Sequence, residues 1–162
     1  MIKIGLIILG TIIGLVVGFC LGVRWISKQY DIHCEKIEKI ADKFSDYYAI
    51  MHQWMRLIQK GHNLSNYCEK NQYKRVAIYG LNDIAYTIIN ELNDFDTKIA
   101  FCIDRNADNL FSEIDLYRPD EDMPDVDVCI VAIPELYREI TEVLKGKMNC
   151  PIISIEDIIW EL

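Results

Sequence analysis

Several side-chain patterns of familiar enzyme classes are missing from this chain. None of its nine tyrosines is followed four residues later by lysine, the pair that short-chain dehydratases and epimerases use. The chain also has no G-x-S-x-G elbow and no Walker loop. It holds one predicted sheet and no second domain for a substrate. We therefore expect no enzyme acting alone, and we assign no catalytic residue.

Basic residues are scarce in the C-terminal part. From Lys74 onward, eight Lys and Arg stand against nineteen Asp and Glu, a net charge of about −11. A surface this acidic repels nucleic acid, so we expect no nucleic-acid partner. Metal-ligand spacing is also missing: His33, His52 and His62 have no regular spacing to each other or to cysteine, and the carboxylates of residues 120–127 fit a solvated loop. We predict no metal site.

The six cysteines show no paired spacing, and Cys102 and Cys129 lie inside apolar runs. Such thiols are usually small core residues of a protein in a reducing compartment, not a disulfide framework.

An uncharged run fills residues 4–23, between Lys3 and Arg24. A helix over it is about 30 Å long, the thickness of a bilayer's hydrocarbon core. The run predicts a single transmembrane helix at residues 1–24. A signal peptide is the alternative, but its apolar core would be shorter and would end in a small-residue cleavage site. Because basic residues follow the run, the positive-inside rule predicts a cell-membrane protein with a cytoplasmic C-terminal head.

Gly10, Gly14, Gly18 and Gly22 recur every four residues in this run. This glycine zipper lets another helix approach closely, so it predicts a homo-oligomer or a membrane protein partner. A glycine face that touches only lipid is the alternative.

Residues 25–61 carry a helical pattern whose apolar positions alternate steps of three and four, as in a coiled coil. The positions are Ile37, Ile40, Phe44, Tyr47, Met51, Trp54 and Ile58. The stripe is narrow up to Phe44, which predicts a stalk that can pair with a second copy. It broadens from Tyr47, which predicts a helix docked on the head, with Trp54 as a core residue. Gly61 ends the helix.

After a linker at residues 62–72, residues 73–162 alternate short apolar runs with amphipathic segments. The runs predict strands at residues 75–79, 98–103, 114–117, 127–133 and 151–155, with helices at residues 83–92, 134–144 and 156–162. Strands that alternate with helices indicate βαβ units. The predicted fold class is α/β: a transmembrane helix, a helical stalk and a small Rossmann-like parallel sheet with flanking helices.

The first strand-to-helix turn carries half of the dinucleotide fingerprint G-x-G-x-x-G. Gly80 supplies the first glycine and Ala85 an accepted variant of the third, but Asn82 replaces the second. Asp83 caps a helix N-terminus well and competes there with a phosphate. Asp104 ends the second strand, where an acidic residue would hold a ribose hydroxyl. Helix capping and a simple turn are the structural alternatives for these polar residues.

Three segments together resemble the small Rossmann-like domain attached to bacterial surface-polysaccharide enzymes, such as nucleotide-sugar dehydratases, sugar transferases and sugar acyltransferases. They are YKRVAIYGLNDIAYTIINEL, KIAFCIDRNAD and DVCIVAIPELYREI. The resemblance implies NAD(P), a nucleotide-sugar or a CoA-like ligand. The candidate cofactor-binding residues are Gly80, Leu81, Asn82, Asp83, Asp104, Arg105, Ala132 and Pro134.

Two functions from different classes follow. The first is a membrane-anchored, nucleotide-binding accessory or sensor module, in surface-polysaccharide biosynthesis by the resemblance. The second is a non-catalytic scaffold with a decayed ligand site. A subunit of a nucleotide-sugar-modifying enzyme is a weaker alternative.

Overall fold

The structure, a computed structural model, describes residues 2–93 and 95–162, and of residues 2–9 and 11–13 only the backbone. The chain divides into two compact units, Met1–Tyr47 and Tyr48–Leu162. One helix, α1 (Ile2–Gln59), runs through the first unit into the second. Gly61, predicted to end this helix, adopts φ +81° just beyond it, and the His62 N–H donates to the Leu57 carbonyl at 3.0 Å.

The predicted transmembrane helix at residues 1–24 is wrong. Within the part of the chain that the structure describes, no helix combines the length and apolarity needed to cross a membrane. Charged residues return along α1 from Arg24 onward, with Lys28 and Asp31 next. Residues 1–9 and 11–13 make up the rest of the predicted anchor apart from Gly10, and they lie outside the residues whose side chains the structure describes.

The predictions that depended on this anchor fall with it: the membrane as partner, the partner membrane protein, and the single-pass cell-membrane localisation with a cytoplasmic head. The four glycines of the zipper lie in α1, and a Cβ at any of them would meet no atom within 4 Å. Their backbone is therefore open, but nothing in the described chain packs on it.

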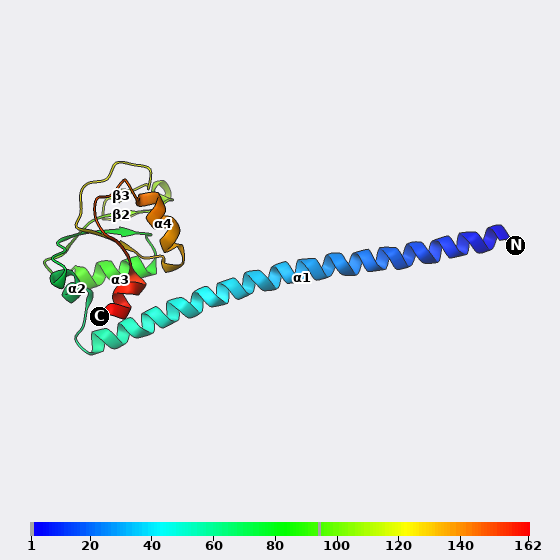
Figure 1. Cartoon of the computed structure of the whole chain (residues 1–162), viewed down its shortest axis with the longest axis horizontal. Helices are drawn as coiled ribbons and strands as arrows, with labels where there is room; N and C mark the ends of the chain where they lie inside the picture. The colour runs from blue at the N-terminus through cyan, green and yellow to red at the C-terminus, as the bar shows by residue number, and fades with distance from the viewer. Residues whose placement is uncertain (1, 94) are drawn as a thin grey trace. The chain divides into compact units, whose positions relative to one another are not determined.

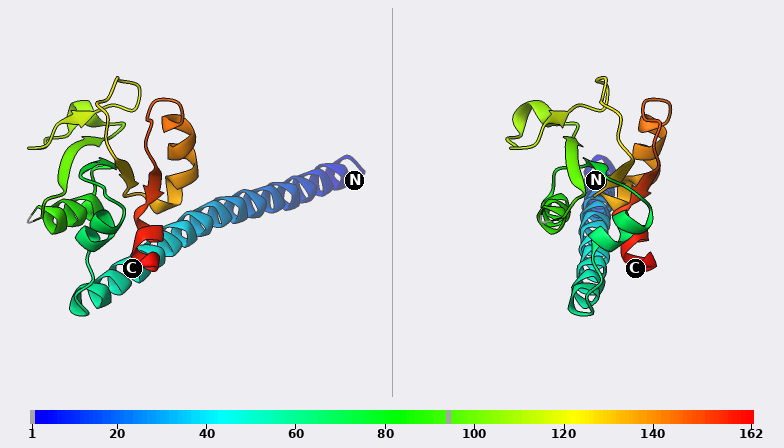
Figure 2. Two further views of the ribbon diagram at one scale, coloured as in Figure 1. Left: turned by 60° about the vertical axis from the view of Figure 1, so that its left-hand side comes forward. Right: turned by 90° about the vertical axis from the view of Figure 1, so that its left-hand side faces the viewer.

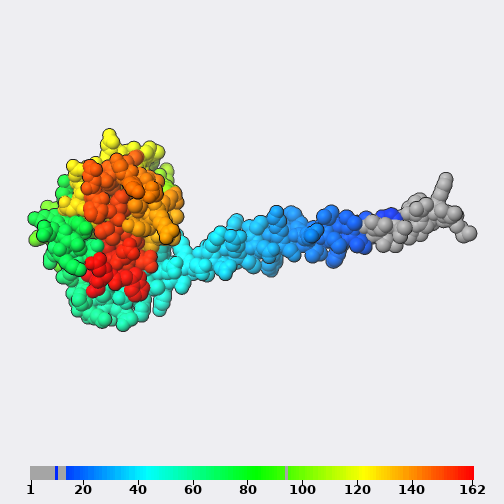
Figure 3. All heavy atoms as spheres, viewed as in Figure 1, coloured from blue at the N-terminus to red at the C-terminus, as the bar shows by residue number. Residues whose placement is uncertain are grey.

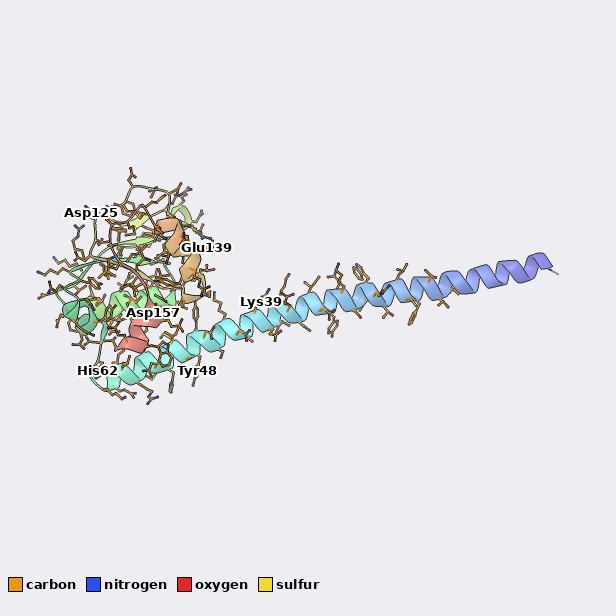
Figure 4. All side chains as sticks on the ribbon, in the orientation of Figure 1. Lys39, Tyr48, His62, Asp125, Glu139 and Asp157 are labelled. Atoms are coloured by element: carbon orange, nitrogen blue, oxygen red, sulfur yellow. The ribbon has the colours of Figure 1, made fainter. Side chains whose placement is uncertain are left out.

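In the first unit, the predicted seam is exposed to solvent. Ile37 and Ile40 are more than half exposed and Phe44 is 69% exposed. Lys39, on the same helix (Figure 4), pairs with Glu35 at 2.7 Å. Pairing of this stripe with a second copy stays a prediction.

In the second unit, the end of α1 docks on the head as predicted. Ile50, Trp54 and Leu57 are buried, Trp54 to 2% exposure. The indole Nε1 of Trp54 donates to Glu91 Oε2 at 2.6 Å, and the Leu64 N–H donates to Glu91 Oε1 at 2.6 Å. Tyr48 and Met55 remain exposed, so only one side of this helix packs.

The sheet confirms the predicted parallel α/β architecture. Its five strands lie in the order β3-β2-β1-β4-β5, and every neighbouring pair is parallel. Figure 1 labels β2 and β3, which lie side by side. Their bounds are β1 Arg75–Tyr79, β2 Lys98–Ile103, β3 Leu116–Tyr117, β4 Val128–Val131 and β5 Ile152–Ser154. The four-residue β4 is buried throughout, as expected for a central parallel strand.

Helices cover both faces of the sheet. α3 (Asp83–Leu92) follows β1 and α4 (Tyr137–Leu144) follows β4, and they lie on opposite sides of the sheet (Figure 2). Successive strand residues point to opposite faces. Thus Tyr79, Phe101 and Val131 pack with Ile140 and Leu144 of α4 in one cluster.

The remaining elements are short. α2 (Leu64–Lys70) forms inside the predicted linker, with a capping box between Asn63 and Asn66. Two 3₁₀ turns, η1 (Ala107–Asn109) and η2 (Pro134–Leu136), follow β2 and β4, so Pro134 opens η2 rather than α4 itself. α5 (Ile155–Glu161) ends the chain. On the face shown in Figure 3, α4 and α5 both reach the surface.

Candidate functional site

The candidate site lies where β1 and β4 end, at the point where the strand order reverses. In open parallel sheets, ligands bind at the carboxyl ends of the strands beside such a switch point. The order β3-β2-β1-β4-β5 places it between β1 and β4. Most of the candidate cofactor-binding residues follow one of these two strands.

Gly80 is glycine for two reasons. Its φ is +92°, a backbone conformation that L-residues rarely adopt. A Cβ at Gly80 would also lie 2.6 Å from Cδ1 and Cγ1 of Ile133. The side chain of Ile133, just after β4, therefore covers the glycine. Ile133 therefore fills the space beside the tight turn that Gly80 makes after β1.

Asn82 joins the turn after β1 to the end of β4. Its Oδ1 accepts from the Ala85 N–H at 3.0 Å, which caps α3, and its Nδ2 donates to the Ala132 carbonyl at 2.9 Å. Both ends of the amide are thus bound within the protein. The capping interpretation of Asn82 accounts for its side chain, and Asp83 adds an exposed carboxylate in the first turn of α3.

Asp104 links the turns after β1 and β2. Its Oδ2 accepts from the Leu81 N–H at 2.9 Å and its Oδ1 from the Asn106 N–H at 2.9 Å. Each carboxylate oxygen can still accept a second hydrogen bond. Asp104 therefore builds the turn and keeps some acceptor capacity toward a ligand hydroxyl.

Arg105 pairs with Glu139, with Nη2 and Oε1 2.6 Å apart. Glu139, labelled in Figure 4, belongs to α4. Glu139 first, and then the Tyr79 hydroxyl, raise the pKa of the Arg105 guanidinium above its ordinary value. Arg105 thus interacts with α4 and with the end of β1.

The structure brings Gly80, Leu81, Asn82, Asp104 and Ala132 into one hydrogen-bonded group. The Ala132 N–H donates to the Tyr79 carbonyl at 2.9 Å, which completes this group. Asp83, Arg105 and Pro134 border it. Sequence reasoning missed Ile133, because a β-branched residue after a buried strand gives no sign that it will cover a distant glycine.

Outside this group of residues, the head has hollows at its surface, but the described residues form no metal site. Within the described residues, no three His, Cys, Asp or Glu side chains gather closely enough to hold a metal ion. A hollow of about 450 Å³ lies between α3 and the loop after η1, lined by Tyr86, Ile89, Asn90, Asn93, Phe111, Ser112, Glu113 and Ile114. A smaller one, of about 250 Å³, lies beside Arg105 and Arg118.

Comparison with protein-family models, with curated proteins and with solved structures finds no match. The resemblance to surface-polysaccharide domains thus still depends on the three quoted segments alone.

Proposed function

We propose that the α/β unit binds a nucleotide-type ligand at the carboxyl edge of its sheet, as an accessory or sensor module. One observation carries the proposal. The strand order has its switch point between β1 and β4, and Asp104 is held beside the β1 turn by the Leu81 N–H. In this kind of sheet, an acidic residue at the end of the second strand is suited to a ribose hydroxyl.

The resemblance to domains of surface-polysaccharide enzymes supports the choice of ligand class: NAD(P), a nucleotide-sugar or a CoA-like group. All three contain a ribose and a diphosphate. The ribose hydroxyl fits the remaining acceptor capacity of Asp104. A diphosphate at the N-terminus of α3, however, would have to displace the Asn82 amide and approach the Asp83 carboxylate.

A scaffold with a decayed ligand site is the second candidate. It is favoured by the side chain of Ile133 over Gly80 and by the amide of Asn82, which is bound at both ends. In that case the sheet would serve only as an interaction surface.

Thermal unfolding of the full chain against NAD(H), NADP(H), UDP, UDP-sugars and acyl-CoA separates the two candidates. A ligand at a hundred times its Kd should stabilise the fold by about 2.7 kcal/mol. We expect Asp104→Asn to reduce the shift and Asp96→Asn, an exposed carboxylate before β2, to leave it unchanged. If the folded wild-type chain shifts with none of these compounds, the scaffold is the better description.

A further inference from the structure

The few basic residues of the head are not spread evenly. From Lys74 onward there are eight Lys and Arg against nineteen Asp and Glu. Three of the eight line one hollow of about 250 Å³: Arg105, Arg118 and Lys147. Pro119, Asp120 and Val143 complete its lining. We call it the basic hollow. In so acidic a unit, three cations around one concave site call for an explanation.

Three different parts of the chain supply these cations. Arg105 follows β2, Arg118 follows β3, and Lys147 follows α4. Lys147 Nζ donates to the Pro119 carbonyl at 2.7 Å, which ties the segment after α4 to the segment after β3. Only the folded sheet brings the three together.

The guanidinium groups are held in place by acidic residues at the protein surface. Arg105 pairs with Glu139 at 2.6 Å, and Arg118 pairs with Asp108 and Asp120, each at 3.1 Å. These carboxylates are 56%, 68% and 68% exposed. Exposed ion pairs are worth only about 0–1 kcal/mol, so an incoming anion can compete for the guanidinium N–H groups.

A buried hydroxyl lies next to one of these cations. Tyr79 is 2% exposed and packs between the sheet and α4. Among the residues that the structure describes, its Oη is the buried side-chain atom without a well-formed hydrogen bond, and its interaction with Arg105 helps to raise the pKa of that guanidinium. Tyr79 does not itself line the hollow, so it acts there only through Arg105.

We propose that the basic hollow binds a phosphate group. A phosphate presents several oxygens and about two negative charges, which matches cations that approach from three parts of the chain. The inference deepens the proposed function, because it gives the ligand's phosphate a place other than the N-terminus of α3, where Asn82 and Asp83 stand. Arg105 directly follows Asp104, so ribose and phosphate sites would adjoin.

Titration of the full chain with inorganic phosphate and pyrophosphate, followed by calorimetry or amide NMR shifts, tests this site directly. We expect Arg118→Gln and Lys147→Gln each to raise the Kd about tenfold or more, because each removes a charge-assisted hydrogen bond. Tyr79→Phe should raise the Kd by a smaller factor, with no change in charge. Lys145→Gln is the matched control: it removes the same charge two residues from Lys147 but outside the hollow.

The outcomes also separate this site from the proposed function. No phosphate or pyrophosphate binding by the folded wild-type chain overturns the site, and so does an equal loss in Lys145→Gln and Lys147→Gln, which would show a net-charge effect only. Nucleotide binding that Arg118→Gln and Lys147→Gln leave unchanged overturns the hollow as the place of the ligand's phosphate but keeps the proposed function. Phosphate binding that these variants abolish, in a chain that binds no nucleotide, keeps the site and removes the proposed function.

Discussion

At the scale of single residues, comparing Gly80 with Gly146 separates two costs of replacing a glycine: the strained backbone conformation and the steric contact of a new side chain. Both have positive φ, +92° and +89°. A Cβ at Gly80 would meet Ile133 at 2.6 Å, whereas a Cβ at Gly146 would meet nothing within 4 Å. Both glycines therefore have a backbone conformation that disfavours other residues, but only Gly80 also lacks room for a side chain.

We predict that Gly80→Ala destabilises the fold clearly more than Gly146→Ala. The left-handed backbone costs an alanine about 1–2 kcal/mol at either site, and overpacking against Ile133 adds about 1–3 kcal/mol at Gly80 only. Urea unfolding of the two variants measures the difference. Adding Ile133→Ala to Gly80→Ala should recover part of the loss. Equal destabilisation by the two single variants would contradict the contact with Ile133.

The cysteines allow another prediction at the same scale. Burial raises the pKa of the Cys68 and Cys102 thiols to about 11 each, and it raises that of Cys129 as well. Cys20 and Cys34 are exposed. At pH 8, we expect a thiol reagent to modify Cys20 and Cys34 in the native chain, and the buried thiols only after unfolding. Mass spectrometry of the modified peptides gives the sites, and rapid native labelling of Cys102 would contradict the buried strand.

At the scale of elements, one carboxylate connects three helices of the second unit. Glu91 of α3 accepts from Trp54 of α1 and from the first N–H of α2, both at 2.6 Å. Burial raises the pKa of Glu91, and the two hydrogen bonds oppose that rise without cancelling it. The folded state therefore holds its proton at a higher pH than the unfolded state does.

From this we predict a definite pH dependence for Glu91. Because its folded pKa lies above its ordinary value of 4.5, its contribution to the free energy of unfolding decreases as the pH rises through the interval between the two values. Glu91→Gln should remove this component and cost about 1–3 kcal/mol at neutral pH, since one of the two acceptors is lost. Urea unfolding at several pH values compares the two proteins. If the free energies of unfolding of the two proteins change with pH in parallel, the pKa of Glu91 is the same in the folded and unfolded states, and the prediction is wrong.

At the scale of the whole molecule, the two units differ in how their side chains are buried. In the described part of the first unit, no side chain is buried, whereas the second unit has many buried apolar side chains. Helical residues without tertiary contacts open readily, and protected ones do not.

We therefore expect trypsin to cut the native full chain first within the first unit, after basic residues that include Lys36, Lys39 and Lys43, and to leave the second unit resistant. The buried Ile50, Trp54 and Leu57 should protect the end of α1. Intact-mass measurement over time identifies the fragments. Protection of all three lysines would instead indicate that the exposed stripe of Ile37, Ile40 and Phe44 is covered in solution.

Local sequence determined most of the elements. Short apolar runs marked the strands, the spacing of Ile84, Ile88 and Leu92 marked α3, and the broadening stripe marked where α1 docks. These signals are local because periodicity follows directly from backbone geometry. The short α2 was missed, since seven residues inside a predicted linker carry too little pattern.

Tertiary structure alone decided the strand order and the character of the site. Residues fifty apart meet where the Asn82 amide reaches Ala132, Ile133 closes over Gly80, and three cations from separate segments line one hollow. The sequence could place Gly80 and Asp104 at strand ends, because a parallel sheet gathers strand ends at one edge. Which side chains then fill that edge depends on long-range packing, which no local pattern encodes.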